Sequence, residues 1–126
     1  MPTQSILVID DDDGIREIVK FSIEAMTDWK VLSVASGSEG IALAEIEQPD
    51  AILLDVMMPD MDGENTFQHL QANAATKNIP TILLTAKAIA KEEQRLSDLG
   101  VAGAIAKPFK ADRLAKQICE ILGWQI

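Results

Sequence analysis

The sequence predicts an α/β fold, a doubly wound parallel sheet of five strands with helices on both faces. Five short runs of the chain are almost continuously apolar, as expected of strands that are buried on both faces. These runs alternate with segments whose apolar residues recur at the helical spacing i, i+3 and i+4. The connections between them are short, and a strand–helix–strand alternation with short connections gives parallel strands.

Each element follows from a local pattern. The apolar runs that predict strands are residues 5–9 (SILVI), 30–34 (KVLSV), 51–56 (AILLDV), 81–86 (TILLTA) and 101–106 (VAGAIA). The segments that predict helices are residues 15–26, 36–48, 67–74, 89–99 and 114–122. Residues 30–34 are less apolar than the other central runs and are expected nearer an edge of the sheet. Ser36 and Glu39 form a capping box that opens the second helix.

Composition bounds the class of protein. The chain has 126 residues, which suits one domain, residues 1–126, without repeats or a linker. Its net charge of −9 argues against binding to a nucleic-acid backbone. No apolar run is long enough to cross a bilayer, and the N-terminus lacks the basic region of a signal peptide. The single cysteine, Cys119, fits a reducing compartment, so a cytoplasmic protein is expected.

Polar residues stand where the predicted strands end. Four aspartates follow the first strand directly, and like charges so close to an apolar core repel one another and lose solvation. In a doubly wound sheet the functional site lies outside the carboxyl ends of the strands. The residues expected at that edge are Asp10, Asp11, Asp55, Thr85 and Lys107. The acidic cluster would be unfavourable alone and is offset when a cation binds it.

This set of side chains suits metal-assisted phosphoryl transfer. Several carboxylate oxygens at one point favour Mg²⁺ or Ca²⁺ over Zn²⁺, and Mg²⁺ commonly accepts phosphate oxygens as its remaining ligands. An aspartate can act as a nucleophile and form an aspartyl-phosphate. The Lys107 ammonium and the Thr85 hydroxyl would stabilise the charge of the phosphoryl oxygens.

Four ordered motifs then resemble the receiver domain of response regulators in two-component signalling. They are ILVIDDD (6–12), LLDVMMPDMDG (53–63), LLTA (83–86) and KPF (107–109), and together they span most of the chain. The resemblance implies a flavodoxin-like (βα)5 fold with strand order 2-1-3-4-5 and a Mg²⁺ cofactor. It implies these roles: Asp55 as phosphoacceptor; Asp11 as direct metal ligand; Asp10 as ligand through water; Met57 as donor of a backbone carbonyl to the metal; Thr85 as switch hydroxyl; Lys107 as bridge to the phosphoryl group; and a cis peptide bond before Pro108.

The same resemblance implies how the protein works. A histidine kinase or phosphotransfer protein would donate a phosphoryl group to Asp55, and the change would alter a protein-binding surface around helix 4, strand 5 and helix 5. The domain would catalyse only its own phosphorylation and dephosphorylation. Because the sequence ends near Trp124, no DNA-binding or catalytic domain is expected to follow. The expected output is therefore a protein contact, without direct nucleic-acid or membrane binding, in a monomer or a phosphorylation-dependent dimer.

One position departs from the family pattern, and two other functions stay open. Receivers often carry an aromatic residue three positions before the lysine, where this chain has Ala104, so the usual coupling to the hydroxyl is in doubt. A haloacid-dehalogenase-like aspartyl phosphatase is the first alternative, because DDDGI (11–15) resembles the D-x-D-G-T of those enzymes apart from Ile15. The second alternative is a pseudo-receiver that binds partners without phosphorylation.

The remaining notable residues have structural interpretations. Asp12 and Asp13 are predicted to be acids at a helix N-terminus, where the macrodipole favours them. His69 is predicted on the surface of the third helix, and Cys119 as a small buried apolar residue. Trp29 is expected to fix the turn before the second strand, and Trp124 to pack over one edge of the sheet.

Overall fold

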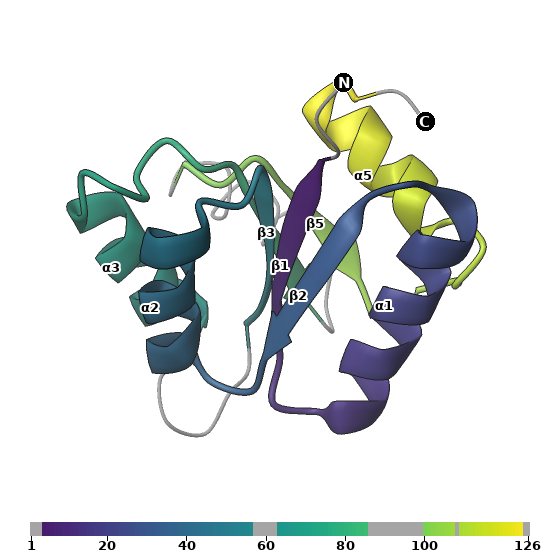
Figure 1. The fold of residues 1–126 in the computed structure, drawn as a ribbon, viewed down its shortest axis with the longest axis horizontal. Helices are drawn as coiled ribbons and strands as arrows, with labels where there is room; N and C mark the ends of the chain where they lie inside the picture. The colour runs from purple at the N-terminus through teal and green to yellow at the C-terminus, as the bar shows by residue number, and fades with distance from the viewer. Residues whose placement is uncertain (1–3, 57–62, 86–99, 108, 125–126) are drawn as a thin grey trace.

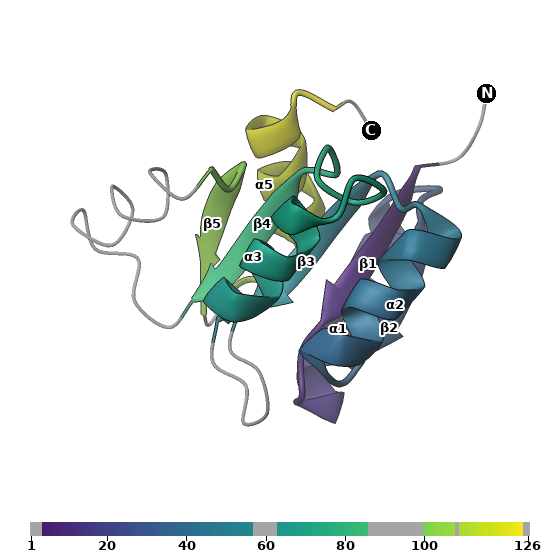
Figure 2. The same cartoon turned by 90° about the vertical axis from the view of Figure 1, so that its left-hand side faces the viewer.

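Five parallel strands form one sheet in the order β2-β1-β3-β4-β5, as the sequence predicts. The computed structural model describes residues 4–56, 63–85, 100–107 and 109–124. Helices α2 and α3 cover one face of the sheet and α1 and α5 cover the other (Figure 1). Figure 2 shows α2 and α3 lying across the sheet, with β5 and β2 at its edges. The second strand is therefore an edge strand, as its weaker apolar character indicates.

The strands are β1 (Ser5–Ile9), β2 (Lys30–Val34), β3 (Ala51–Asp55), β4 (Thr81–Thr85) and β5 (Gly103–Ala106). The helices are α1 (Asp13–Met26), α2 (Gly37–Glu47), α3 (Gly63–Ala72) and α5 (Leu114–Leu122). Among the described residues no helix has both the length and the apolar character needed to cross a membrane.

Alternate residues of the central strands enter two separate cores, because successive side chains of a strand point to opposite faces. Ile6 and Val8 of β1 pack with Val19 and Ile23 of α1 and with Ile118 of α5. On the other face, Leu7, Ile9, Ile52 and Leu54 pack with Ala44 of α2 and with Phe67 and Leu70 of α3. Both faces are buried, which explains why these strands are continuously apolar instead of alternating.

Two helix starts match the predicted caps. Asp12 is the N-cap of α1, where its side chain accepts a hydrogen bond from the Ile15 amide at 3.2 Å. Ser36 is the N-cap of α2 and accepts from the Glu39 amide at 3.2 Å. Asp13 lies in the first turn of α1, so both acids occupy the helix terminus where the macrodipole stabilises negative charge.

Some predicted boundaries are wrong. β3 ends at Asp55, one residue earlier than predicted, and β5 begins at Gly103 instead of residue 101. β4 is described as far as Thr85, and its predicted end at residue 86 falls outside the described residues. The third helix stops at Ala72, so Ala74 lies outside it. Its end has a local cause, because the Thr76 hydroxyl donates to the Leu70 carbonyl at 2.6 Å and occupies an acceptor of the last turn. The predicted helix 89–99, Met57 and Pro108 fall outside the described residues.

Candidate functional site

The predicted site residues meet at one edge of the sheet because of strand register. Ile9 of β1 is paired with Leu54 of β3. The residues that follow them in the chain, Asp10 and Asp55, therefore lie at the same level. Asp55 is paired in turn with Leu84, and Thr85 with Ala106. Lys107 follows directly, and its amide donates to the Thr85 carbonyl at 2.7 Å. The carboxyl ends of β1, β3, β4 and β5 thus contribute to one place.

Three carboxylates form the acidic cluster of this site, which consists of Asp10, Asp11 and Asp55. One oxygen of each lies within 4.8 Å of the others. Asp10 is completely buried, Asp55 is buried and Asp11 is exposed. Buried carboxylates in this arrangement need compensating charge, since each has lost most of its hydration.

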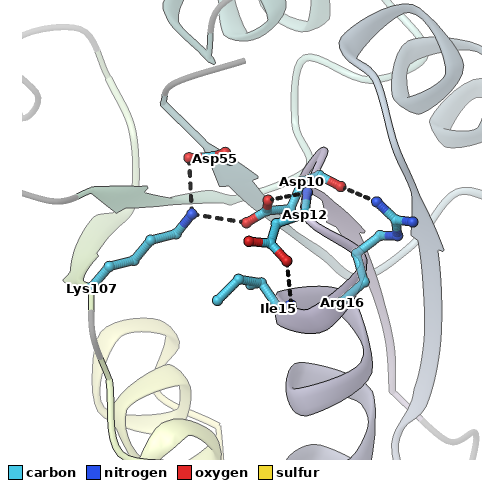
Figure 3. A network of polar contacts seen from close by, with 6 residues as sticks. All are labelled: Asp10, Asp12, Ile15, Arg16, Asp55 and Lys107. Carbon is cyan, nitrogen blue, oxygen red and sulfur yellow. Dashed lines mark hydrogen bonds and ion pairs between the residues drawn. The ribbon is translucent and has the colours of Figure 1, made fainter. Parts of the chain in front are cut away.

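Lys107 supplies part of that charge. Its ammonium nitrogen lies 3.0 Å from Asp10 Oδ2 and 3.1 Å from Asp55 Oδ1. In Figure 3 the lysine side chain extends from the end of β5 across the sheet edge to reach both carboxylates. Among the described side chains, Lys107 is thus the cation in contact with the carboxylates of two of the three acids.

The protonation of Lys107 follows from these contacts. Its burial lowers the pKa of the ammonium group, but the hydrogen bonds and charges of Asp10 and Asp55 act in the opposite direction and prevail. The pKa of Lys107 is therefore raised above its ordinary value of 10.5. The lysine is a cation at neutral pH and binds anionic oxygens without needing a proton from another group.

Asp10 is held from three directions. One oxygen, Oδ1, accepts the Asp12 amide at 2.9 Å, while Oδ2 accepts from Lys107. The main-chain carbonyl of Asp10 accepts from the Arg16 guanidinium at 2.6 Å. Arg16 also pairs with Asp13, and its side chain is only 17% exposed. Arg16 was not predicted from the sequence, because an arginine in the first turns of an amphipathic helix is typical of an exposed surface.

Gly63 is a second residue that sequence analysis did not assign to the site. A Cβ atom added there would lie 2.5 Å from the Asp55 carbonyl oxygen and 2.7 Å from the Val56 Cα. The Gly63 amide also donates to the Val56 carbonyl at 2.9 Å. The start of α3 therefore lies directly against the main chain at Asp55. The signal in the sequence is the Asp-Gly pair at 62–63, which is equally typical of an ordinary turn.

The other predicted positions are less completely defined. Thr85 is the last residue of β4 and is partly exposed at the same edge as Asp55. Met57, expected to offer a backbone carbonyl, lies outside the described residues. Ala104 is partly buried in β5 and packs on the core beneath α2 and α3, so no ring is available at that position to follow a movement of Thr85. His69 is exposed on α3, as predicted.

The donor set suits a hard divalent cation. The cluster offers only carboxylate oxygens, and one of its members is open to solvent. Mg²⁺ prefers oxygen ligands and usually keeps several waters beside one or two carboxylates. Asp10, Asp11 and Asp55 are therefore the side chains that would hold Mg²⁺, and sulfur or imidazole ligands typical of zinc are absent from this cluster.

Comparisons with known proteins agree with this geometry. The family described as response regulator receiver domain matches residues 6–119. The DNA-binding dual master transcriptional regulator RpaA of Synechocystis is 34% identical over 93% of this chain and 48% of its own length. The polar-differentiation response regulator DivK of Brucella ovis is 29% identical over 96% of this chain and 98% of its own length. The chain spans about half the length of several such relatives.

Solved structures show the same fold. The chemotaxis response regulator CheY4 of Vibrio cholerae superposes with a TM-score of 0.88 at 27% identity, over 96% of this chain and all of the other. The receiver domain of the sensor histidine kinase PA1611 from Pseudomonas aeruginosa gives 0.83 at 27% identity, over 98% of this chain and all of the other. That structure has a magnesium ion coordinated in its active-site cleft. These similarities favour a signalling domain over the haloacid-dehalogenase-like phosphatase.

Proposed function

Because the chain belongs to the response regulator receiver domain family, which acts in phosphorylation-based two-component signalling and binds Mg²⁺ in an acidic site, we propose that Asp55 is its phosphoacceptor. The observation that carries the proposal is the contact of Lys107 with both Asp10 and Asp55 beside a third carboxylate. Asp10, Asp11 and Lys107, which the sequence predicts at the strand ends, support the proposal because they lie close to Asp55. The domain, residues 1–126, would act as a switch and not as an enzyme with an external product.

The chain's own residues account for the chemistry of the transfer. An Asp55 carboxylate oxygen attacks the phosphorus of the donor, a new O–P bond forms, and the bond from phosphorus to the donor breaks with its electron pair leaving on the donor. Lys107, already 3.1 Å from Asp55 Oδ1, stabilises the negative charge of the transferred group. Thr85, at the end of the neighbouring strand, is proposed to donate its hydroxyl to the same group.

The acidic cluster is proposed to hold Mg²⁺ during this reaction. Asp11 and Asp55 would be direct ligands, Asp10 would act through water, and Met57 would add a main-chain carbonyl. A bound Mg²⁺ supplies positive charge to the phosphoryl oxygens and reduces the repulsion between an anionic donor and three carboxylates. With Mg²⁺ held by the carboxylates, the Lys107 ammonium, which contacts Asp10 and Asp55 here, would be available to the phosphoryl group.

Receiver domains interact with histidine kinases or phosphotransfer proteins. Two exposed apolar residues of α1 support docking of such a phosphodonor on this helix. Ile18 and Phe21 are 46% and 75% exposed and lie one turn apart on the helix that begins two residues after Asp11. Large exposed apolar side chains beside a reaction site are typical of a protein-contact surface. We propose that the phosphodonor covers this pair while it presents its phosphoryl group to Asp55.

One hollow in the described part of the proposed output surface is lined by two cations. This hollow of about 330 Å³ between the end of β5 and the start of α5 is lined by Ala106, Phe109, Lys110, Arg113 and Gln117. Neither Lys110 nor Arg113 forms an ion pair within the described ranges, although the whole chain carries a net charge of −9. This favours a downstream protein with acidic side chains at the contact. We propose that residues 1–126 do not bind nucleic acid directly. We also propose a cytoplasmic location, because of the signalling role.

A phosphorylation assay tests the proposal against both alternatives. The protein is incubated with a small acyl phosphate and Mg²⁺, and the intact mass is recorded. We expect the mass of one phosphoryl group to be added, and no addition in Asp55→Asn or in the presence of a chelator. Asp28→Asn, an exposed acid outside the site, is the matched control and should react normally. No addition to the wild type would favour the pseudo-receiver. Continuous release of phosphate by Asp55→Asn would favour the phosphatase.

A further inference from the structure

We propose that Arg16 is a positioning residue for the metal site, which acts through the main chain of Asp10 and not by contact with metal or phosphoryl group. The inference rests on the proposed metal site and extends it to Arg16, the fourth residue of α1. Its basis is the two-armed contact of the guanidinium. Nη1 donates to the Asp10 carbonyl oxygen at 2.6 Å, and Nη2 pairs with the Asp13 carboxylate.

The location of Arg16 separates its role from that of Lys107. Figure 3 shows Asp10 between the two cations, with Lys107 reaching its carboxylate from one side and Arg16 reaching its main chain from the other. Lys107 thus neutralises the side chain, whereas Arg16 fixes the backbone from which that side chain projects. The arginine side chain is 17% exposed, so its position is set by packing as well as by hydrogen bonds.

The loop that Arg16 holds carries two of the three carboxylates. Residues 10–13 are all aspartates, whose mutual repulsion favours separation of the loop from the sheet edge. The Asp10 carbonyl and the Asp13 carboxylate stand at the two ends of this stretch, and Arg16 joins them. The Asp12 amide adds a bond to Asp10 Oδ1 at 2.9 Å inside the loop. Arg16 therefore holds the loop in the conformation that brings Asp10 and Asp11 close to Asp55.

Two effects of removing Arg16 have opposite signs, which makes the inference testable. Loss of a positive charge near the cluster would strengthen the binding of a cation by simple electrostatics. Loss of the loop contact would weaken it, because partners that orient metal ligands typically contribute about ten-fold or more to metal affinity. Positioning therefore predicts weaker Mg²⁺ binding in Arg16→Met, and a charge effect alone predicts tighter binding.

Two further variants complete the design. Lys20→Met removes the same charge one turn later on α1. Lys20 lines the same hollow as Arg16, but its ion-pair partner is Glu24, at 3.9 Å, and not the Asp10 loop. Arg16→Lys keeps the charge but loses the planar fork that serves two acceptors at once. If Arg16→Met fails to fold, Mg²⁺ binding by Arg16→Lys still tests the proposal. We expect Arg16→Lys to remain weakened and Lys20→Met to bind Mg²⁺ like the wild type.

The measurement is calorimetric titration of the protein with Mg²⁺ alone, followed by Asp55 phosphorylation rates across a range of Mg²⁺ concentrations. We expect a dissociation constant about ten-fold higher for Arg16→Met and a maximal rate near that of the wild type once Mg²⁺ saturates. Unchanged or tighter binding in Arg16→Met, or full recovery in Arg16→Lys, would overturn the inference. If the wild type binds Mg²⁺ but is not phosphorylated, the proposed function fails while the Mg²⁺ titration still decides the role of Arg16.

Discussion

Lys107 and the two carboxylates that it contacts show how a single residue links stability to function. Asp10 is completely buried, and Lys107 is the cation within 3.0 Å of its carboxylate. A buried carboxylate that loses its charged partner costs the folded state more than the pair contributed, because it cannot recover its hydration. The proposed function depends on the same negative charge, since the carboxylates of Asp10, Asp11 and Asp55 would hold the metal.

Replacement of Lys107 by Met should therefore destabilise the metal-free protein and be rescued by Mg²⁺. We expect a loss of about 1–3 kcal/mol in the free energy of unfolding, the typical cost of leaving a buried polar group without its partner. Mg²⁺ should restore more stability to Lys107→Met than to the wild type, because it replaces the missing positive charge. Urea unfolding with and without Mg²⁺ measures both effects. Equal stability of variant and wild type without metal would contradict the account.

The contribution of Lys107 should also depend on pH in a defined direction. Because its pKa is raised above 10.5 in the folded protein, the stabilisation is complete below that pH and is lost as the pH rises through the folded-state value. The difference in unfolding free energy between wild type and Lys107→Met should stay constant from neutral pH to about pH 10 and then decrease. A difference that is lost between pH 7 and 9 would show that another group is responsible.

At the scale of elements, the approach of α3 to the end of β3 controls where Asp55 lies. Gly63 opens α3 against the main chain of Asp55 and Val56, and there is no space for a side chain. The two elements are thus coupled by a backbone contact instead of a side-chain interaction. A displacement here would move Asp55, the proposed phosphoacceptor, relative to Asp10 and Lys107.

Gly63→Ala should therefore lower both stability and the rate of phosphorylation. The added Cβ would lie 2.5 Å from a backbone oxygen, so α3 or β3 must shift, at a cost of about 1–3 kcal/mol for such overpacking. Gly14→Ala is the matched control, because its Cβ would meet only the Asp12 carboxylate oxygen, at 3.2 Å. Thermal unfolding and the rate of mass addition measure the two effects. A normal rate in Gly63→Ala would mean that the contact does not position Asp55.

Whole elements were largely predictable from the sequence, and the reasons are physical. A strand buried on both faces is apolar throughout, so β1 was predicted with the bounds that it has. The weaker apolar run 30–34 also has the bounds of β2, which lies at the edge of the sheet. The start of β5 and the end of α3 were not predicted, because they depend on individual hydrogen bonds. The Ala102 amide pairs with the Thr81 carbonyl before β5 begins, and the Thr76 hydroxyl occupies the Leu70 carbonyl at the end of α3. Side-chain patterns carry no information on such bonds.

The candidate site was predictable to a similar extent. Asp10, Asp11, Asp55 and Lys107 were expected to meet because they follow strand ends, and the structure brings them together. Arg16 and Gly63 were missed, because each acts on main-chain atoms. An arginine that binds a carbonyl and a glycine that permits a close approach look like any surface arginine and any turn glycine in a single sequence. The roles of Thr85 and Met57 stay predictions.

At the scale of the whole molecule, the candidate site and the contact between the two tryptophans lie at opposite ends of the sheet. In Figure 1, α1 begins at the carboxyl ends of the strands, and the connection from α1 to β2 lies at their amino ends. Trp124 packs on Trp29 edge to face, with ring centroids 5.1 Å apart, and so joins the end of α5 to the start of β2. Trp124 also packs against the core beneath α1 and α5.

Binding of Mg²⁺ should stabilise the whole fold, because the cluster forms only when distant segments come together. Metal that binds only the folded state adds about 2.7 kcal/mol at a concentration one hundred times the dissociation constant. The melting temperature should rise with Mg²⁺ in the wild type, and Asp11→Asn should abolish most of that rise. In the absence of metal the same variant should be at least as stable as the wild type, since it relieves repulsion. A full Mg²⁺ response in Asp11→Asn would contradict the assignment of the site.

The most direct measurement is the location of the phosphoryl group after reaction with a small acyl phosphate and Mg²⁺. The aspartyl-phosphate is trapped by hydride reduction, and the modified residue is identified by peptide mass spectrometry. The account predicts a single modified residue, Asp55, whose modification requires Mg²⁺. A phosphoryl group on any other residue, or modification of Asp55 at the same rate without a divalent cation, would contradict it.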